Sequence, residues 1–147
     1  MKPPTVPRRH DRVVIDTMVL IYLFEDTPRY GALCERILRD IARGKYMGIV
    51  TPITVAELLV KPLQQDRTDL ADAYRRALSS LQNVELTPMT FDTGCMAGAL
   101  RAKYGFALPD MFQVAAAFQT PDPAILTNDK ALRRIENVRV FLLDEML

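Results

Sequence analysis

The segment Arg12-Val13-Val14-Ile15-Asp16-Thr17 decides the fold class. Its three consecutive β-branched residues are typical of a strand that is buried on both faces of a parallel sheet. An acid and a hydroxyl residue follow directly, at the point where such a strand would end. We therefore predict a first buried strand at residues 13–15, with polar side chains at its carboxyl end.

Apolar runs alternate with segments of helical periodicity through the rest of the chain. The alternation predicts a parallel sheet that is covered by helices on both faces. We expect Lys61-Pro62 to end one helix and Gly105 to close the helix that begins at Thr90. Further strands are expected at residues 46–50, 84–86, 124–127 and 138–143, and helices at 20–24, 30–43, 52–60, 68–81, 90–104, 109–118 and 129–135.

The composition is that of a soluble globular domain, with 147 residues of which 49% are hydrophobic and 25% charged. We expect one domain from residue 12 to 147, preceded by a tail at residues 1–11 that is rich in proline and basic residues. No apolar run approaches the roughly 18 residues that span a bilayer, and no signal peptide is evident, so we expect a cytoplasmic protein without a membrane partner. Cys34 and Cys95 are expected to be thiols that fill the core.

Four carboxylates stand where a parallel sheet builds its sites: Asp16, Glu57, Asp110 and Asp129. Each also has a structural interpretation, since the three aspartates could cap helices and Thr54-x-x-Glu57 matches a capping box. The carboxyl ends of parallel strands share one edge, so we expect Asp16, Glu57 and Asp129 to converge. Converging carboxylates repel one another unless a cation joins them, and oxygen ligands without a Cys/His cluster favour Mg²⁺ or Mn²⁺ over Zn²⁺.

Four segments, in order and spacing, resemble the four motifs of the PIN-domain family, and most closely those of VapC-type toxins of bacterial toxin–antitoxin pairs. The resemblance implies a three-layer α/β/α fold with a central parallel sheet of four or five strands, and an endonuclease that cleaves RNA. The segments are Val14-Ile15-Asp16-Thr17-x-Val19-Leu20-Ile21, Thr54-Val55-Ala56-Glu57-Leu58-Leu59, Arg101-Ala102-x-Tyr104-Gly105-x-x-Leu108-Pro109-Asp110 and Leu126-Thr127-Asn128-Asp129.

Carried over by position, the resemblance assigns Asp16, Glu57 and Asp110 to the core metal-binding set. Asp129 matches the more variable fourth acid, which would bind a second ion or position the attacking water. The supporting polar residues are Thr17, Thr127 and Asn128.

Two positions depart from the family pattern. Met18 stands where family members commonly have Asn or Ser, which removes a polar group that could orient a metal-bound water. The late helix begins Asp110-Met111-Phe112-Gln113 in place of Asp-Ala, which predicts a bulkier pocket rim. Neither departure removes a core acid.

The implied partners are an RNA substrate, an antitoxin protein and a second copy of the chain. The net charge of +1 becomes +5 if the four acids are neutralised, so the remaining surface is basic. Candidate phosphate contacts are Lys61, Arg101, Lys103, Lys130, Arg133 and Arg134. A homodimer is expected because the first two helices carry more apolar residues than one sheet face covers, namely Leu20, Ile21, Leu23, Phe24, Leu33, Ile37 and Ile41.

Other functional classes fit less well. A haloacid-dehalogenase phosphatase needs a second Asp at the position of Met18, and the sequence contains neither G-x-G-x-x-G nor a Walker A motif. His10 is the single histidine and lies in the tail, which argues against histidine catalysis. The alternatives that remain are a PIN-like RNA-binding or scaffold module with little or no activity, and a solitary RNA-processing nuclease.

Overall fold

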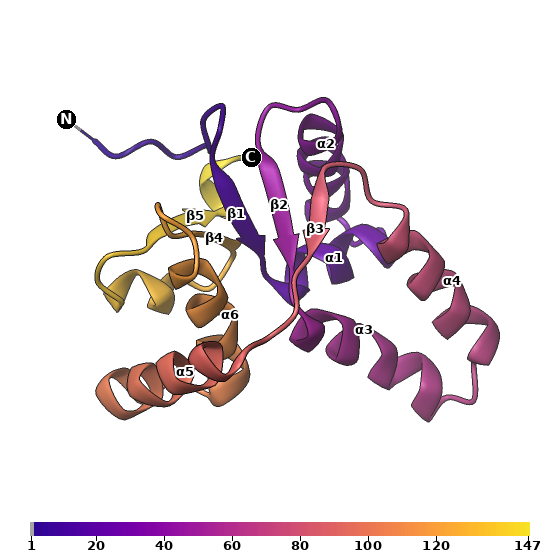
Figure 1. Cartoon of the computed structure of the whole chain (residues 1–147). Coiled ribbons are helices and arrows are strands. Elements are labelled where there is room, and N and C mark those ends of the chain that lie inside the picture. The colour runs from indigo at the N-terminus through magenta and orange to yellow at the C-terminus, as the bar shows by residue number, and fades with distance from the viewer. Residues whose placement is uncertain (1) are drawn as a thin grey trace.

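The computed structural model describes residues 2–147; Met1, the first residue of the expected tail, lies outside them. Five strands form one sheet in the order β3-β2-β1-β4-β5, and every neighbouring pair is parallel (Figure 1). The strands are β1 (Arg12–Ile15), β2 (Met47–Val50), β3 (Val84–Leu86), β4 (Ala124–Thr127) and β5 (Arg139–Leu142). The predicted parallel sheet is confirmed, with five strands.

The strand order changes direction at β1. The chain passes from β1 to β2 and β3 on one side, and the last two strands are added on the other side. In the register of the sheet, Val14 pairs with both Ile49 and Ile125, so β1 is the central strand. A ligand site in such a sheet lies outside the carboxyl ends of the strands at this switch in order, which here is the end of β1 and β4.

Helices cover both faces of the sheet. The side chains of Val13 and Ile15 pack with α1 (Thr17–Phe24) and α2 (Tyr30–Ala42), and the intervening Val14 packs with α5 (Phe91–Tyr104) and α6 (Leu108–Phe118). The alternation follows from the two-residue period of a strand. Two short 3₁₀ helices complete the chain, η1 (Lys130–Arg134) and η2 (Leu143–Glu145). The three-layer α/β/α architecture is therefore confirmed.

The remaining two helices, α3 (Pro52–Gln64) and α4 (Thr68–Ser79), form a pair that extends beyond the sheet (Figure 1). Pro62 is buried inside α3, so the expectation that Lys61-Pro62 ends this helix is wrong. Only two residues of the helix follow Pro62, so its missing N–H costs one hydrogen bond in the last turn. Burial of the proline ring offsets that loss.

Helix α5 begins and ends as its sequence predicts. The Thr90 and Thr93 side chains form a reciprocal capping box at its start, and Gly105 has a positive φ of 79° at its end. That backbone conformation favours glycine, which has no Cβ.

Two expectations about apolar and thiol side chains need correction. Cys34 is buried in the core, but Cys95 on α5 is exposed, because it lies on the face of α5 that points away from α6 and the sheet. The apolar excess on the first two helices is smaller than expected, because four of the seven residues are fully buried and three are half-buried. Leu20, Leu33, Ile37 and Ile41 are buried in the core, and Ile21, Leu23 and Phe24 are half-buried against it.

The described tail at residues 2–11 contains no helix or strand. Between residues 2 and 147, no helix is long and apolar enough to cross a membrane.

Candidate active site

Asp16 lies at the carboxyl end of β1 and is 8% exposed. Its Oδ1 accepts a hydrogen bond from the Thr17 backbone N–H at 2.8 Å, which makes it the N-cap of α1. Its Oδ2 accepts a hydrogen bond from the Thr127 hydroxyl at 2.7 Å, across the switch between β1 and β4. The capping interpretation is therefore confirmed for Asp16, and its role as a metal ligand stays a prediction.

Asp129 follows β4 and is joined to Asp16 through Thr127. The Asp129 backbone N–H donates to Thr127 Oγ1 at 3.1 Å, while the Asp129 carboxylate caps η1 by accepting from the Ala131 N–H at 3.0 Å. Asn128 is directed elsewhere, since its Oδ1 accepts from the Asp144 backbone N–H at 3.3 Å. That contact ties η2 to the end of β4, and the supporting role of Asn128 beside the acids stays a prediction.

Glu57 projects from the second turn of α3 and is exposed. The capping-box interpretation is wrong, because α3 begins at Thr51 and Pro52, well before Glu57. The Thr17 hydroxyl donates to Glu57 Oε1 at 2.8 Å. The Thr17 hydroxyl therefore links the sequence motif that contains Asp16 to the motif that contains Glu57.

Asp110 is the third residue of α6 and is half-buried. It does not cap the helix, since the N-cap position is Ala107. The pKa of Asp110 is raised first by burial and then by the negative charges of Asp16, Asp129 and Glu57. Asp110 therefore lies close enough to the other three predicted acids for their charges to act on it.

The pKa of Asp16 is also raised. Burial is the largest cause, the hydrogen bonds from Thr127 and Thr17 oppose it, and the charges of Glu57 and Asp129 add to it. In the chain from Lys2 onward, no Lys, Arg or His nitrogen lies within 4.0 Å of any of the four carboxylates. Their mutual repulsion is not relieved by a basic side chain of the described protein.

The donors fit a hard divalent cation in kind, because they are carboxylate oxygens with hydroxyl oxygens beside them. Among residues 2–147, however, no group of three or more His, Cys, Asp or Glu side chains is arranged so that it could hold a metal ion. Thr17 and Thr127 bind the carboxylates of Glu57 and Asp16, whereas no hydrogen bond to the side-chain oxygens of Asp110 occurs within the described residues.

The six candidate phosphate contacts differ in how far they are already engaged. Arg133 makes two hydrogen bonds to Glu145, at 2.6 and 2.7 Å, and Arg101 donates to the carbonyl oxygens of Gly105 and Phe106 at the end of α5. The others keep exposed charged groups: Lys61 within 3.3 Å of Glu25, Lys103 over the Tyr104 ring, Arg134 over the Phe106 ring, and Lys130.

Gln113 is the polar residue of this site that the sequence interpretation missed. We expected it at the pocket rim, yet it is 1% exposed, and it contacts the hydroxyl groups of Thr51, Thr54 and Thr17. An amide among Val114, Ala115, Ala116 and Ala117 on a buried helix was a usable signal, because buried amides need hydrogen-bond partners.

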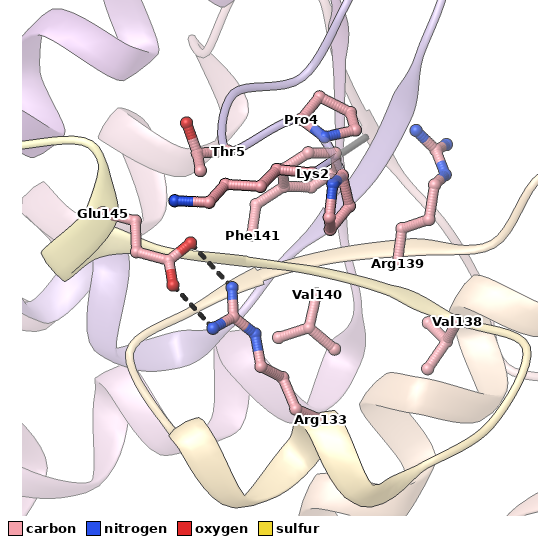
Figure 2. A pocket seen from close by; sticks show the side chains of 10 residues that line it. Lys2, Pro4, Thr5, Arg133, Val138, Arg139, Val140, Phe141 and Glu145 are labelled. Atoms are coloured by element: carbon pink, nitrogen blue, oxygen red, sulfur yellow. Dashed lines mark hydrogen bonds and ion pairs between the residues drawn. The ribbon is translucent and has the colours of Figure 1, made fainter.

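A cavity of about 370 Å³ adjoins one of the four acids, Glu57. It is also lined by Glu25, Lys61 and Gln65 and by apolar and aromatic side chains of α1, α3 and α4. A larger cavity of about 740 Å³ lies elsewhere, between the tail and β5 (Figure 2). None of the four acids lines it; its rim contains the Arg133–Glu145 ion pair shown in Figure 2. We therefore place the functional site at the acids and not at the larger cavity.

Solved structures of toxin–antitoxin complexes have the same fold. VapBC2 from Rickettsia felis, bound to a promoter DNA fragment, matches with a TM-score of 0.72 and 16% identity over 88% of this chain and 97% of that one. A toxin–antitoxin complex from Klebsiella pneumoniae matches with a TM-score of 0.65 and 24% identity, over 86% and 94% of the two chains. DNA-bound VapBC from Salmonella typhimurium matches with a TM-score of 0.68 and 17% identity, over 90% and 98%.

Curated protein sequences contain no significant match to this chain. A sequence profile of the PIN domain matches residues 13–138, which include all four acids. With the parallel five-stranded sheet and the acids at its switch point, this match shows that the chain belongs to the PIN-domain family.

Proposed function

We propose that this PIN-domain protein is a metal-dependent endoribonuclease and the toxin of a toxin–antitoxin pair. The observation that carries the proposal is the convergence of Asp16, Glu57, Asp110 and Asp129 without a basic partner among the described residues. A fold does not retain mutually repelling acids for stability, since their repulsion opposes folding. A site for a divalent cation and a phosphodiester explains them.

In this proposal Asp16 and Asp110 hold Mg²⁺ or Mn²⁺, with Glu57 as a direct ligand or through water. Such an ion supplies a nucleophile at neutral pH, by lowering the pKa of water, and neutralises charge on the phosphate. The Thr127 and Thr17 hydroxyls orient the carboxylates of Asp16 and Glu57. Asp129 positions the attacking water or contributes to a second metal position.

RNA binding is assigned to cations that flank the acidic motifs in the sequence. Lys61 is the strongest candidate, because it shares the 370 Å³ cavity with Glu57 and is held only by the exposed Glu25. Lys103, Lys130 and Arg134 are also accessible to phosphates. Arg101 and Arg133 are weaker candidates, because RNA would have to replace hydrogen bonds that the protein already makes.

An antitoxin partner is proposed because the similar structures are toxin–antitoxin complexes. A guanidinium from such a partner would satisfy several carboxylates at once and would compete with the metal. A homodimer and a cytoplasmic location remain part of the proposal, although four of the seven apolar residues first used to argue for the dimer are buried by the fold itself. Light scattering at micromolar concentration tests the dimer, and a monomeric mass contradicts it.

The activity is tested by following the cleavage of a mixed RNA pool while Mg²⁺ or Mn²⁺ is titrated, and again after chelation. We expect endonucleolytic fragments that require the metal. RNA binding without cleavage at any metal concentration would instead indicate the binding or scaffold module.

The toxin assignment has a separate test in a bacterial host. Expression of the chain alone is expected to slow growth, Asp16→Asn to relieve the effect, and a small protein encoded beside it to bind and block cleavage. Metal-dependent cleavage together with harmless expression and no such inhibitor would indicate a solitary RNA-processing nuclease.

A further inference from the structure

We propose that Gln113 is a positioning residue for Glu57, which it orients through the hydroxyl groups of Thr54 and Thr17. Gln113 does not contact Glu57 itself; the two are joined by a chain of hydrogen bonds that crosses from α6 through α3 to α1. The catalytic consequence rests on the proposed nuclease function, but the hydrogen-bond chain does not.

The amide group of Gln113 is buried, and both its oxygen and its nitrogen form hydrogen bonds. Its Oε1 accepts from the Thr51 hydroxyl at 2.6 Å, and its Nε2 donates to Thr54 Oγ1 at 2.6 Å, with Thr17 Oγ1 at 3.4 Å. Thr51 and Thr54 are themselves buried, at 1% and 0% exposure. An amide without partners in this position would strongly destabilise the fold, so these contacts are necessary for a glutamine to be present at all.

The direction of every proton in the chain follows from its end at Glu57. An ionised carboxylate only accepts, so the Thr17 hydroxyl must donate its single proton to Glu57 Oε1. Thr17 Oγ1 lies 2.9 Å from Thr54 Oγ1 and must therefore accept the Thr54 proton. Thr54, its own proton committed, must accept from Gln113.

Rotating the Gln113 amide by half a turn breaks this order. The amide oxygen would then face Thr54 Oγ1 at 2.6 Å, and the one Thr54 proton could not serve both Gln113 and Thr17. One oxygen–oxygen contact would be left without a proton, which is repulsive. The observed orientation of the Gln113 amide is the one that satisfies every group while the Thr17 proton points at Glu57, so Gln113 supports the donor that holds this carboxylate.

Glu57 needs such a determinant because it is otherwise unrestrained. It is exposed, it forms no ion pair among the described residues, and the neighbouring carboxylates repel it. A single charge-assisted hydrogen bond from Thr17 holds it towards Asp16. Replacing Gln113 by an apolar residue frees the Thr54 and Thr17 protons to adopt other directions, so this restraint weakens.

The kinetic test compares Gln113→Leu, Thr17→Val and the double variant with the wild type in metal-dependent RNA cleavage. We expect Gln113→Leu to lower kcat by about tenfold, with KM changed by less than about twofold, because misplacement of one ligand affects the reacting geometry more than RNA binding. Adding Gln113→Leu to Thr17→Val is expected to have no further effect on kcat, because the chain is already broken. Thr17→Ser, which keeps the hydroxyl, should retain most of the activity.

The matched control is Val114→Ala, a loss of buried volume at the next position of the same helix. This variant is expected to be less stable while its kcat stays within about twofold of the wild type. Equal loss of kcat in Val114→Ala, or multiplicative losses in the Gln113 and Thr17 double variant, would overturn the positioning role.

A second measurement does not depend on activity. The Tm is measured without RNA or metal for wild type, Gln113→Leu, Glu57→Ala and the double variant. We expect Gln113→Leu to lower the Tm less in the Glu57→Ala background, because the Thr17 proton no longer has to point at a carboxylate. Additive shifts would contradict the hydrogen-bond chain, whereas coupled shifts in a protein that cleaves no RNA would contradict only the proposed function.

Discussion

The two ends of β1 carry one aspartate each, and the two side chains are in opposite electrostatic environments. At the amino end, Asp11 Oδ2 lies 3.0 Å from an Arg139 guanidinium nitrogen and accepts from the Arg8 backbone N–H at 2.7 Å. At the carboxyl end, Asp16 accepts hydrogen bonds from a hydroxyl and a backbone amide but has no cation beside it among the described residues. The negative charges of Glu57 and Asp129 act on Asp16, and the charge of Asp16 acts on Asp110.

The pKa shifts of the two residues follow their surroundings. Burial opposes ionisation of Asp11, but the hydrogen bonds from the Arg139 side chain and the Arg8 backbone, with the charges of both arginines, outweigh it, so the pKa of Asp11 is lowered. Burial raises the pKa of Asp16, and the neighbouring acids raise it further. The charge of the first aspartate stabilises the fold and the charge of the second opposes folding, which supports the proposed role of Asp16 in the site.

The largest expected difference between the two ends is catalytic. Asp16→Asn and Asp110→Asn should each lower cleavage by about a thousandfold or more, because a metal ligand contributes several kcal/mol to the transition state. Asp11→Asn should leave cleavage within about twofold, as measured by initial rates at saturating Mg²⁺. Near-wild-type rates for Asp16→Asn or Asp110→Asn would show that the site is assigned wrongly.

Asp129→Asn is expected to have an intermediate effect, a loss of about tenfold in kcat. An amide oxygen still caps η1 by accepting from the Ala131 N–H, and the three core acids remain in place. The same rate assay measures it, with circular dichroism to show that the fold persists. A completely inactive Asp129→Asn protein would add this residue to the core set.

The stability effects should have opposite signs at neutral pH. Because its pKa is raised, folded Asp16 binds more protons than the unfolded chain between about pH 3.9 and its folded pKa, so its ionisation lowers stability above that window. Because its pKa is lowered, Asp11 contributes stability above about pH 3.9 that is lost as the pH falls through its folded pKa.

At pH 7 we therefore expect Asp16→Asn to raise the free energy of unfolding by about 1 kcal/mol and Asp11→Asn to lower it by about as much. Urea unfolding at pH 7 and at pH 3 measures both, and both differences should shrink at the lower pH. Changes of the same sign for the two variants at pH 7 would remove the contrast between the ends of β1.

The smallest expected effect concerns two exposed lysines, each in a single ion pair. Lys61 pairs with Glu25 beside the acids, and Lys45 pairs with Asp40 near the amino end of β2. In an inactive Asp16→Asn protein, Lys61→Ala should weaken RNA binding and reduce the slope of log K against log salt concentration by about one. Lys45→Ala should change neither the affinity nor the slope. Equal effects of the two lysines would indicate non-specific attraction instead of a defined RNA path.

The boundaries of most elements could be predicted because their signals are local. A run of β-branched residues, the Thr90 start and the Gly105 end of α5 all act within one strand or one helical turn. Pro62 could not be predicted in the same way. Whether a proline ends a helix depends on how much helix follows it and on whether its ring is buried, and neither is visible in the residues beside it.

The placement of the four acids near one edge of the sheet could be expected from the sequence by itself. Asp16 and Asp129 follow strands, Asp110 lies in the first turn of a helix, and Glu57 lies in the helix after β2. Only the tertiary structure decided which side chains form hydrogen bonds to these acids and to each other. Gln113 lies 59 residues from Thr54, and Thr17 lies 40 residues from Glu57, yet each pair shares a hydrogen bond. The same holds for Arg133, which Glu145 engages. Hydrogen bonds depend on distances of about 3 Å between side chains, and only the packing of α1, α3 and α6 determines those distances.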